Sequence, residues 1–322
     1  MNAVQPVLTI TLNPALDLTT SVGRLEPRQK LRCEPPRYDP GGGGINVSRA
    51  IRKLGGDSLA FVALGGATGA QLRALLDEEG VAYTIYDSRG ETRISFTVVD
   101  RSSDRPYRFV LPGPEQSGEE DRLLAALADC IGANGFRYIV YIVASGSLPP
   151  GLAPEFWARL AGRVDAAGAR FMLDTSGPAL EAAGRSGLFL IKPNREEAQA
   201  LLGDRAGAPE SDAELARALA EQGIAEIVVL TLGRDGAIVA AGDRRFRLRS
   251  PDVEVRSTVG AGDSFLAALT LGLARDWSLE DSCRYGIAAA ASTVTTEGTE
   301  LCERAQTERF FEESVGTVEP LE

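Results

Sequence analysis

The segment Val259–Ser264 combines small residues, two glycines and one acid just before an apolar run that is typical of a helix. Glycine lets a backbone come close to an anion, and a helix N-terminus offers that anion unpaired N–H groups and the positive end of a dipole. Asp263 would repel a phosphate bound there, so an acid at this position is unexpected. Its presence is explained if Asp263 is the base that takes a proton from a hydroxyl attacking that phosphate. The turn therefore predicts phosphoryl transfer; the alternative is a plain helix start with an acid that the dipole favours.

Other motifs for nucleotide binding and for acid–base catalysis do not fit this chain. The dinucleotide-binding pattern would need a third glycine where Phe265 stands, and no glycine is followed by the Lys and Ser/Thr of a P-loop. The chain has no histidine, which excludes a histidine base, a Ser-His triad and a histidine metal site. Acid–base work must then fall to a carboxylate, Lys, Tyr or Cys, which favours Asp263 as the base.

Four consecutive glycines, Gly41–Gly44, open a second predicted helix and precede Asn46. The run favours close approach of the backbone to a sugar whose hydroxyls bind Asn46; the alternative is a flexible hinge. Asp17 follows the first predicted strand, where it can accept hydrogen bonds from two sugar hydroxyls or cap a turn. Arg93 starts a predicted hairpin, and its guanidinium suits a substrate phosphate, although a solvated arginine is at least as common in so arginine-rich a chain.

Lysine is rare, since Lys30, Lys53 and Lys192 are the only three. Lys53 falls on the polar face of a predicted helix, whereas Lys30 and Lys192 suggest a specific use. Lys192 begins the pattern Lys-Pro-Asn-x-x-Glu at a strand end, and Asn194 and Glu197 in that pattern can form a capping box. The alternative is that they organise the Mg²⁺ of a nucleotide through water, because Mg²⁺ keeps its waters and prefers oxygen ligands, with Lys192 on the phosphates.

Short apolar segments alternate with amphipathic helical segments along the chain. Continuous apolar strands separated by helices indicate a mostly parallel sheet covered on both faces, so we expect an α/β fold. Strands are expected at Val7–Leu12, Leu59–Leu64, Tyr138–Val143, Arg170–Leu173, Leu188–Ile191, Glu226–Leu232 and Ala237–Ala241. Helices are expected at Ile45–Leu54, Thr68–Glu79, Glu119–Ile131, Pro154–Ala166, Arg195–Leu202, Asp212–Gln222, Ala261–Ala274 and Leu279–Thr295.

The predicted sheet brings the candidate residues together. In an open parallel sheet, ligands bind beyond the carboxyl ends of the strands. Polar turns with glycine or proline follow the predicted strands there, at Asn13–Asp17, Ser145–Gly151, Asp174–Gly177, Lys192–Asn194 and Thr231–Gly233. Packing alone does not explain such a concentration at one rim, which therefore predicts a binding site.

Two further strand pairs lack helices of their own and predict a small sheet beside the core. Arg93–Val99 and Pro106–Leu111 flank a polar turn and indicate an antiparallel hairpin, and Leu16–Val22 and Lys30–Tyr38 make the second pair. We expect this sheet, over about 16–40 and 91–112, to be a lid on the site, with its second face covered by a homodimer. We expect the terminal Glu313–Glu322 to fray.

Composition restricts the partners and the compartment. The length of 322 residues suits one large or two modest domains, and a net charge of −11 without a basic patch argues against nucleic acid. An anionic substrate then needs a local cluster of positive groups. No apolar run approaches the ~18–20 residues that span a bilayer, and the N-terminus has no signal-peptide pattern, so we expect no membrane partner and a cytoplasmic location. The scattered cysteines Cys33, Cys130, Cys283 and Cys302 are expected to be reduced thiols.

These residues resemble the PfkB/ribokinase family of sugar kinases from Thr11–Asp17 to Gly298–Thr299, nearly the whole chain. The Gly41–Asn46 segment and the Val259–Ser264 turn are similar to the two signatures of that family, and the pair is highly specific. Ribokinases usually have an Asp where Ser257 stands. The segments that resemble the minor 6-phosphofructokinase branch are Lys30–Cys33, Pro40–Val47, Tyr107–Gly113 and Ser145–Gly151.

The resemblance implies a single ribokinase-like kinase domain over 1–322 that transfers a phosphoryl group from Mg-ATP to O1 of fructose 6-phosphate, giving fructose 1,6-bisphosphate. It implies Asp263 as the base and the N–H groups of Gly260, Ala261 and Gly262 as the anion hole. The sugar-phosphate contacts that it implies are Asp17, Lys30, Arg32, Gly42, Gly43, Asn46, Arg93 and Ser147. On the nucleotide and magnesium side it implies Lys192, Asn194, Glu197, Thr231 and Gly233, with Glu197 holding Mg²⁺ through water. Ser257 and Val259 resemble a site for a monovalent cation, usually potassium.

Three alternatives stay open at this point. A 1-phosphofructokinase or a tagatose-6-phosphate kinase would differ in how the sugar's phosphate lies relative to Arg93, although those branches more often carry a lysine where this chain has Gly43. A non-catalytic sensor of sugar phosphates or nucleotides is expected to have lost the base or the anion hole, and this chain keeps both.

Thr296 stands near the place where the family has an asparagine, so the adenine contacts are not predicted.

Overall fold

The computed structural model describes residues 4–132, 140–203, 209–314 and 317–321. Its centre is one sheet of ten strands in the order β14-β13-β12-β11-β10-β9-β8-β1-β4-β5. The strands from β11 to β5 run parallel, and β12, β13 and β14 are antiparallel additions at one edge. Their bounds are β1 Val7–Thr11, β4 Leu59–Leu64, β5 Ala82–Asp87, β8 Tyr141–Ser145, β9 Arg170–Asp174, β10 Leu188–Ile191, β11 Ala225–Thr231, β12 Ala237–Ala241, β13 Arg244–Leu248 and β14 Val318–Pro320.

Helices cover both faces of this sheet, which explains why its strands are continuously apolar. In β11, Val228 and Leu230 pack with α3 to α7, whereas Ile227 and Val229 pack with α1, α8 and α9 on the opposite face. The predicted α/β fold with a mostly parallel sheet is confirmed. The helices are α1 Gly43–Lys53, α2 Gly66–Glu78, α3 Glu120–Gly132, α4 Phe156–Ala166, α5 Pro178–Ala183, α6 Arg195–Leu202, α7 Asp212–Glu221, α8 Ala261–Ala274, α9 Leu279–Val294 and α10 Arg304–Glu313, with a 3₁₀ turn, η1, at Gly233–Asp235.

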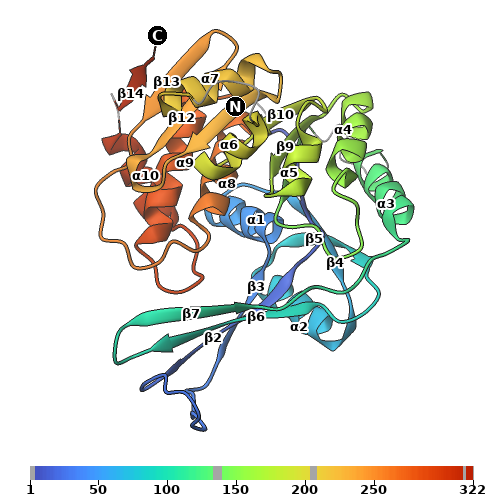
Figure 1. Ribbon diagram of the computed structural model, residues 1–322, viewed down its shortest axis with the longest axis vertical. Coiled ribbons are helices and arrows are strands. Elements are labelled where there is room, and N and C mark those ends of the chain that lie inside the picture. The colour runs from blue at the N-terminus through green and yellow to red at the C-terminus, as the bar shows by residue number, and fades with distance from the viewer. Residues whose placement is uncertain (1–3, 133–139, 204–208, 315–316, 322) are drawn as a thin grey trace.

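A second sheet of four strands projects from this core, at the bottom of Figure 1. Its order is β3-β2-β6-β7, with β2 at Ala15–Val22, β3 at Arg37–Gly41, β6 at Arg93–Asp100 and β7 at Arg105–Val110. β6 and β7 form the predicted antiparallel hairpin, and β2 joins β6 in parallel. Because β2 follows directly on β1 of the large sheet, the small sheet is held against the carboxyl ends of the core strands.

Three predicted segments differ from the structure. The strand expected over Lys30–Tyr38 is instead Arg37–Gly41, because Pro35 and Pro36 have no N–H to donate to a ladder. The prediction that Glu313–Glu322 frays is wrong, since Val318–Pro320 pairs with β13. The predicted start of the third strand, at Tyr138, lies outside the described residues. Among those residues, no helix is long and apolar enough to cross a membrane.

Candidate active site

A cavity of about 450 Å³ lies where the carboxyl ends of the core strands meet the small sheet. Its walls come from β2, β6 and β7 of the small sheet, from the ends of β8 and β9, and from the N-terminal turns of α1 and α8. This is the rim that the sequence predicted as a binding site. The predicted site residues that line it are Asp17, Gly42, Gly43, Asn46, Arg93, Ser147, Glu197, Val259, Gly260 and Asp263.

The first turn of α8 presents Asp263 to this cavity. Gly260 is the residue before the helix and has a φ of 78°, a left-handed conformation that favours glycine. The Asp263 carboxylate accepts a hydrogen bond from Asn46 Nδ2 at 2.9 Å and one from Ser145 Oγ at 3.2 Å. Three elements, α1, β8 and α8, therefore fix one carboxylate beside the N-terminus of a helix.

The environment of Asp263 raises the pKa of its carboxyl group. Burial, and secondly the nearby charge of Asp174, raise its pKa to about 6, and hydrogen bonds from Asn46 and Ser145 with the charge of Lys192 oppose that rise. A carboxylate with this pKa is ionised at neutral pH and can accept a proton from an attacking hydroxyl. The geometry thus suits a general base.

Lys192 lies behind Asp263, at the end of β10. Its Nζ pairs with Asp174 Oδ1 at 3.2 Å, and its side chain is 9% exposed. Burial disfavours the charged ammonium, but Asp174 and Asp263 outweigh that effect and raise the pKa of Lys192. Ser145 Oγ also lies 3.4 Å from Asp174 Oδ2, so its single proton can be donated to either acid. Ser145, Asp174 and Lys192, at the ends of the consecutive sheet strands β8, β9 and β10, therefore form a single charged cluster with Asp263 of α8.

Asp17 is the acid on the small-sheet side of the cavity. It is buried on β2, and this burial raises its pKa to about 6, although the charges of Arg108 and Arg93 oppose the rise. A side chain on Gly41, its neighbour on β3, would overlap the Asp17 carboxylate. The glycine therefore leaves room for this acid, which is one physical reason for the first residue of the glycine run.

The remaining glycines of the run have two roles. Gly42 has a φ of 126°, a backbone conformation that is strained for any residue with a side chain. A Cβ on Gly43 would collide with Ser145. Both residues also line the cavity. The run is therefore required by the close packing of α1 against β8, and it also brings backbone N–H groups to the site.

Arg93 reaches the cavity while its guanidinium is partly occupied. Its Nε and Nη2 donate to the carbonyl of Asn13 at 3.2 and 3.0 Å, and Nη1 donates to the carbonyl of Leu111 at 3.4 Å. Ser147 also lines the cavity, and its hydroxyl accepts a hydrogen bond from Asn13 Nδ2 at 3.1 Å. Asn13, at the end of β1, thus orients two predicted sugar-phosphate contacts.

Asn194 and Glu197 form a capping box, which was one of the two predictions for this pair. Asn194 Oδ1 accepts from the N–H of Glu197 and Glu197 Oε2 accepts from the N–H of Asn194, each at 2.9 Å. Glu197 also lines the cavity, so the capping function does not exclude a ligand there. Thr231, at the end of β11, donates through its N–H to the carbonyl of Pro193, and Gly233 follows in an exposed turn.

Lys30 and Arg32 are not brought to the cavity within this chain. Both are exposed in the segment between β2 and β3, which lies at the end of the small sheet away from the core in Figure 1. Ser257 lies outside the cavity lining, where its hydroxyl donates to the carbonyl of Gly298 at 2.7 Å and accepts from the N–H of Val259. Gly262 lies behind the turn, close to Lys192.

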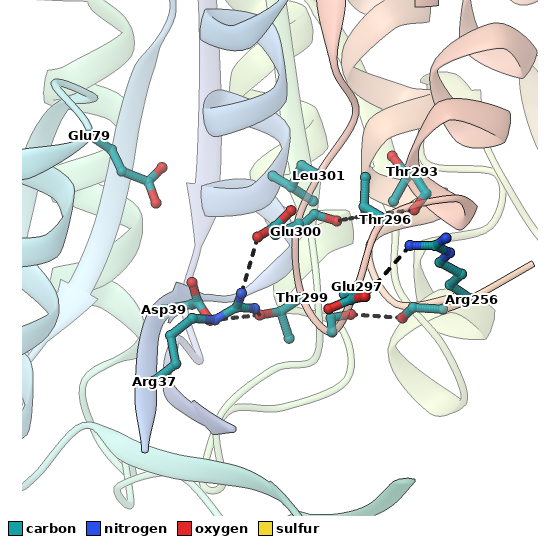
Figure 2. A network of polar contacts seen from close by, with 12 residues as sticks. Arg37, Asp39, Glu79, Arg256, Thr293, Thr296, Glu297, Thr299, Glu300 and Leu301 are labelled. Atoms are coloured by element: carbon teal, nitrogen blue, oxygen red, sulfur yellow. Dashed lines mark hydrogen bonds and ion pairs between the residues drawn. The ribbon is translucent and has the colours of Figure 1, made fainter. Parts of the chain in front are cut away.

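The small sheet is tied to the loop after α9, as Figure 2 shows. Arg37 on β3 donates to Glu300 Oε1 at 3.1 Å and to Thr299 Oγ1 at 3.2 Å, and Thr299 Oγ1 donates to Asp39 Oδ2 at 2.8 Å. Thr299 lines the cavity, and Asp39 stands opposite Asp17 in the β2–β3 register. The tie therefore joins a small-sheet strand to the side of the cavity formed by the C-terminal half.

Several residues that line the cavity were not predicted as site residues, and Ser145, Asp174 and Arg108 are the charged or hydrogen-bonding ones that matter most to the site. Ser145 and Asp174 lie in two of the predicted rim turns. Only the hydrogen bond of Ser145 to Asp263 and the charge of Asp174 near Asp263 distinguish them from ordinary turn residues. Arg108 alternates on β7 with exposed aromatic side chains, and it lines the cavity together with Val110. The period of two in that strand was the available signal, because it places Arg108 and Val110 on one face and Tyr107 and Phe109 on the other.

Comparison with known proteins adds an independent finding. The profile described as pfkB family carbohydrate kinase matches residues 10–306. An ATP-dependent 6-phosphofructokinase isozyme 2 of Mycobacterium tuberculosis is 43% identical over 95% of this chain and 89% of the relative. A 1-phosphofructokinase of Xanthomonas campestris is 35% identical over 86% of each chain.

Solved structures of phosphofructokinase-2 from Escherichia coli share the fold. The complex of that enzyme with fructose-6-phosphate has a TM-score of 0.88 and 36% identity, over 97% of this chain and 99% of that one. The same enzyme has been solved in complex with potassium, again with a TM-score of 0.88, and in a tetrameric inhibited form with a TM-score of 0.87.

Proposed function

Because the chain belongs to the pfkB family of carbohydrate kinases, we propose that it is an ATP-dependent 6-phosphofructokinase that phosphorylates O1 of fructose 6-phosphate. The observation that carries the proposal is the Asp263 carboxylate, which stands in the cavity at the N-terminus of α8 with hydrogen bonds from Asn46 and Ser145. A base beside an anion-binding turn is what transfer of a phosphoryl group to a hydroxyl requires.

Asp263 accepts the proton of the sugar hydroxyl as that oxygen attacks the γ-phosphorus of ATP. The N–H groups of Gly260, Ala261 and Gly262, at the positive end of α8, stabilise the negative charge on the transferring group. Lys192 adds a positive charge on the same side, held in place by Asp174. The chain thus supplies a base and positive groups for the transfer, and positioning of the two substrates provides the rest.

The sugar phosphate binds between the small sheet and α1. Asp17 and Asn46 bind sugar hydroxyls, and the backbone of Gly42 and Gly43 allows close approach. The phosphate of the substrate binds near Arg93 and Ser147 at the small-sheet end. We assign Lys30 and Arg32 to the same phosphate, through the small sheet acting as a lid, although neither reaches the cavity within one chain.

The residues near Glu197 fit a water-rich Mg²⁺ bound with ATP. Within the described residues there is no cluster of three or more His, Cys, Asp or Glu side chains that could hold a metal. Such a cluster is not needed, because Mg²⁺ keeps several waters and takes one or two carboxylates together with phosphates. Glu197 supplies that carboxylate, Asn194 fixes it, and Thr231 and Gly233 lie on the nucleotide side. When bound, Mg²⁺ neutralises the phosphate charge that develops in the transfer.

Oxygen atoms that suit a monovalent cation gather beside the α8 turn. The Ser257 hydroxyl and the Gly298 carbonyl lie 2.7 Å apart, next to Val259. A cation such as K⁺ would take these oxygens as ligands in place of their mutual hydrogen bond. We therefore place a K⁺ site at Ser257 and Val259, directly before the anion hole in the chain. Replacing K⁺ by choline in the assay tests this assignment through the KM for ATP.

We also infer that residues 1–322 act as one kinase domain and that two copies join through their small sheets. Tyr107 and Phe109 of β7 are 43% and 45% exposed and face away from the cavity side of the strand. An apolar sheet face of this kind needs cover. The tetrameric inhibited form of the Escherichia coli enzyme leaves room for a larger assembly of dimers. ATP and sugar phosphates are cytoplasmic metabolites, which agrees with the expected cytoplasmic location.

The deciding experiment is an ADP-release assay of the purified protein with fructose 6-phosphate, fructose 1-phosphate and tagatose 6-phosphate in turn. The proposal requires the highest kcat/KM with fructose 6-phosphate. A higher value with one of the other sugars would identify the corresponding branch of the family instead. ATP binding by calorimetry without phosphorylation of any of the three would favour a non-catalytic sensor.

A further inference from the structure

Arg49 is a buried arginine on α1, one turn after Asn46, that does not touch the cavity. Its side chain is 6% exposed. Nε and Nη2 donate to the two carboxylate oxygens of Glu79, each at 2.6 Å, in the bidentate geometry that holds a guanidinium in one orientation. The remaining nitrogen, Nη1, donates to Asn46 Oδ1 at 3.3 Å and to the carbonyl of Pro40 on β3 at 3.2 Å.

This contact determines which way the Asn46 amide faces. The amide has one acceptor oxygen and one donor nitrogen. With Oδ1 turned toward the cationic Arg49, Nδ2 is turned toward Asp263 Oδ2, to which it donates at 2.9 Å. The reversed amide would set its N–H against the guanidinium and its oxygen against the carboxylate, so both contacts would be repulsive.

We propose that Arg49 is a positioning residue for the phosphoryl transfer, which fixes Asn46 so that its amide donates to the Asp263 carboxylate. The chain of contacts runs from Glu79 through Arg49 and Asn46 to Asp263, and every link in it is a hydrogen bond. The inference rests on the proposed function only in that Asp263 must act in catalysis.

Packing alone does not account for an arginine here. Removing an ionised group from water is expensive, and apolar side chains of similar size often stabilise a fold at least as well as a buried ion pair. Glu79 follows the last turn of α2, so the ion pair also joins α1 to α2. A structural role and a positioning role therefore make different predictions once Asn46 is removed.

The test is a double-mutant cycle on kcat with fructose 6-phosphate as substrate. Arg49→Met is expected to lower kcat by about tenfold in the otherwise unchanged protein, because the amide of Asn46 is no longer held. In an Asn46→Ala background the same change is expected to lower kcat by less than about twofold, because nothing is left to position. Equal losses in the two backgrounds would overturn the proposal.

A matched control lies one turn along the same helix. Arg52 is exposed and donates through Nε to the carbonyl of Glu79 at 2.8 Å, so it also ties α1 to α2. Arg52→Met is expected to leave kcat within about twofold of the unchanged protein. A tenfold loss in this control would show that the tie between the helices, and not the orientation of Asn46, is what matters.

Further variants separate folding from positioning. Arg49→Lys keeps a cationic donor and is expected to retain more kcat than Arg49→Met; equal losses would contradict the proposal. If Arg49→Met does not fold, as thermal unfolding would show, Glu79→Gln weakens the anchor instead. It is expected to lower kcat by about threefold, again only while Asn46 is present. Absence of turnover by the unchanged protein with any sugar phosphate would refute the proposed function, whereas turnover with an additive cycle would refute only the role of Arg49.

Discussion

Replacing the base carboxylate by its neutral isostere should separate catalysis from stability in this protein. Asp263→Asn keeps the size and shape of the side chain and removes only the negative charge. A positioned general base contributes about 10²- to 10⁴-fold to a rate, so kcat is expected to fall by that factor. The KM for ATP should change little, because the groups proposed to bind its phosphates, the helix N-terminus and Lys192, remain.

The same change should stabilise the fold at neutral pH. Burial and Asp174 raise the pKa of Asp263 from its ordinary 3.8 to about 6, so the folded protein holds this proton more tightly than the unfolded chain does. A group of this kind lowers the stability of the fold as pH rises from about 4 to about 6, and a shift of that size corresponds to about 3 kcal/mol at pH 7. Asp263→Asn removes this cost, and the Asn46 contact that it weakens is worth less, about 1 kcal/mol.

The assay combines ADP release over pH with thermal unfolding. For the unchanged protein, kcat/KM should rise with pH through about 6, with roughly one-tenth of the plateau rate at pH 5, because only the ionised carboxylate accepts a proton. The Asn variant should lose this acidic limb and melt at a higher temperature at pH 7. Near-normal kcat in a folded Asn variant would refute the base assignment, and a lower melting temperature would refute the account of its electrostatics.

Three other substitutions test other parts of the site. Arg93→Gln should raise the KM for fructose 6-phosphate about tenfold or more and leave the KM for ATP within about twofold, in the ADP-release assay. Lys192→Met should lower kcat by about tenfold or more and, by leaving Asp174 and Asp263 without a counter-charge, shift the acidic limb of the pH profile upward. If the proposed dimer forms through the small sheets, Phe109→Glu should convert it to a monomer in light scattering at micromolar concentration, whereas exposed Arg105→Glu should not.

The sequence was sufficient for the core of the fold because its strands are buried on both faces. Strands such as Leu59–Leu64 and Leu188–Ile191 are continuous apolar runs, and both were predicted with their bounds. β5 and β13 were missed because they lie at or next to the sheet edges, where few of their residues are buried. Arg244–Leu248 buries only Phe246 and Leu248 and exposes or half-exposes its arginines, so it looks like a polar loop.

The candidate site was predictable as a set of turns but not as a set of contacts. Asp263 and the glycine run are recognisable from local spacing, because a helix N-terminus and a close approach are local properties. Ser145 and Asp174 become site residues only through the order of β8, β9 and β10 in the sheet, which brings them beside Lys192. No local pattern distinguishes these two residues from the caps of ordinary turns.

The positions of the charges account for the way an acidic protein can hold two phosphorylated substrates. Arg93 and Arg108, on the small sheet, face Asp17, whereas Lys192 and the N-terminus of α8, on the core, face Asp174 and Asp263. The positive groups thus form two separate sets, and each set is already balanced by an acid. A phosphate arriving at either end competes with that acid for the cation, so the net charge of −11 does not exclude it locally. Since Asp17 and Asp263 both have pKa values of about 6, they lose their charge as pH falls below that value and compete less strongly for the cations. A phosphate monoester takes up a proton in the same pH range, which weakens its attraction to the arginines and opposes the gain from the neutral Asp17. Sugar-phosphate binding at the Arg93 end should therefore change less than turnover does as pH falls below 6, a divergence that calorimetry and the ADP-release assay can measure on the same protein.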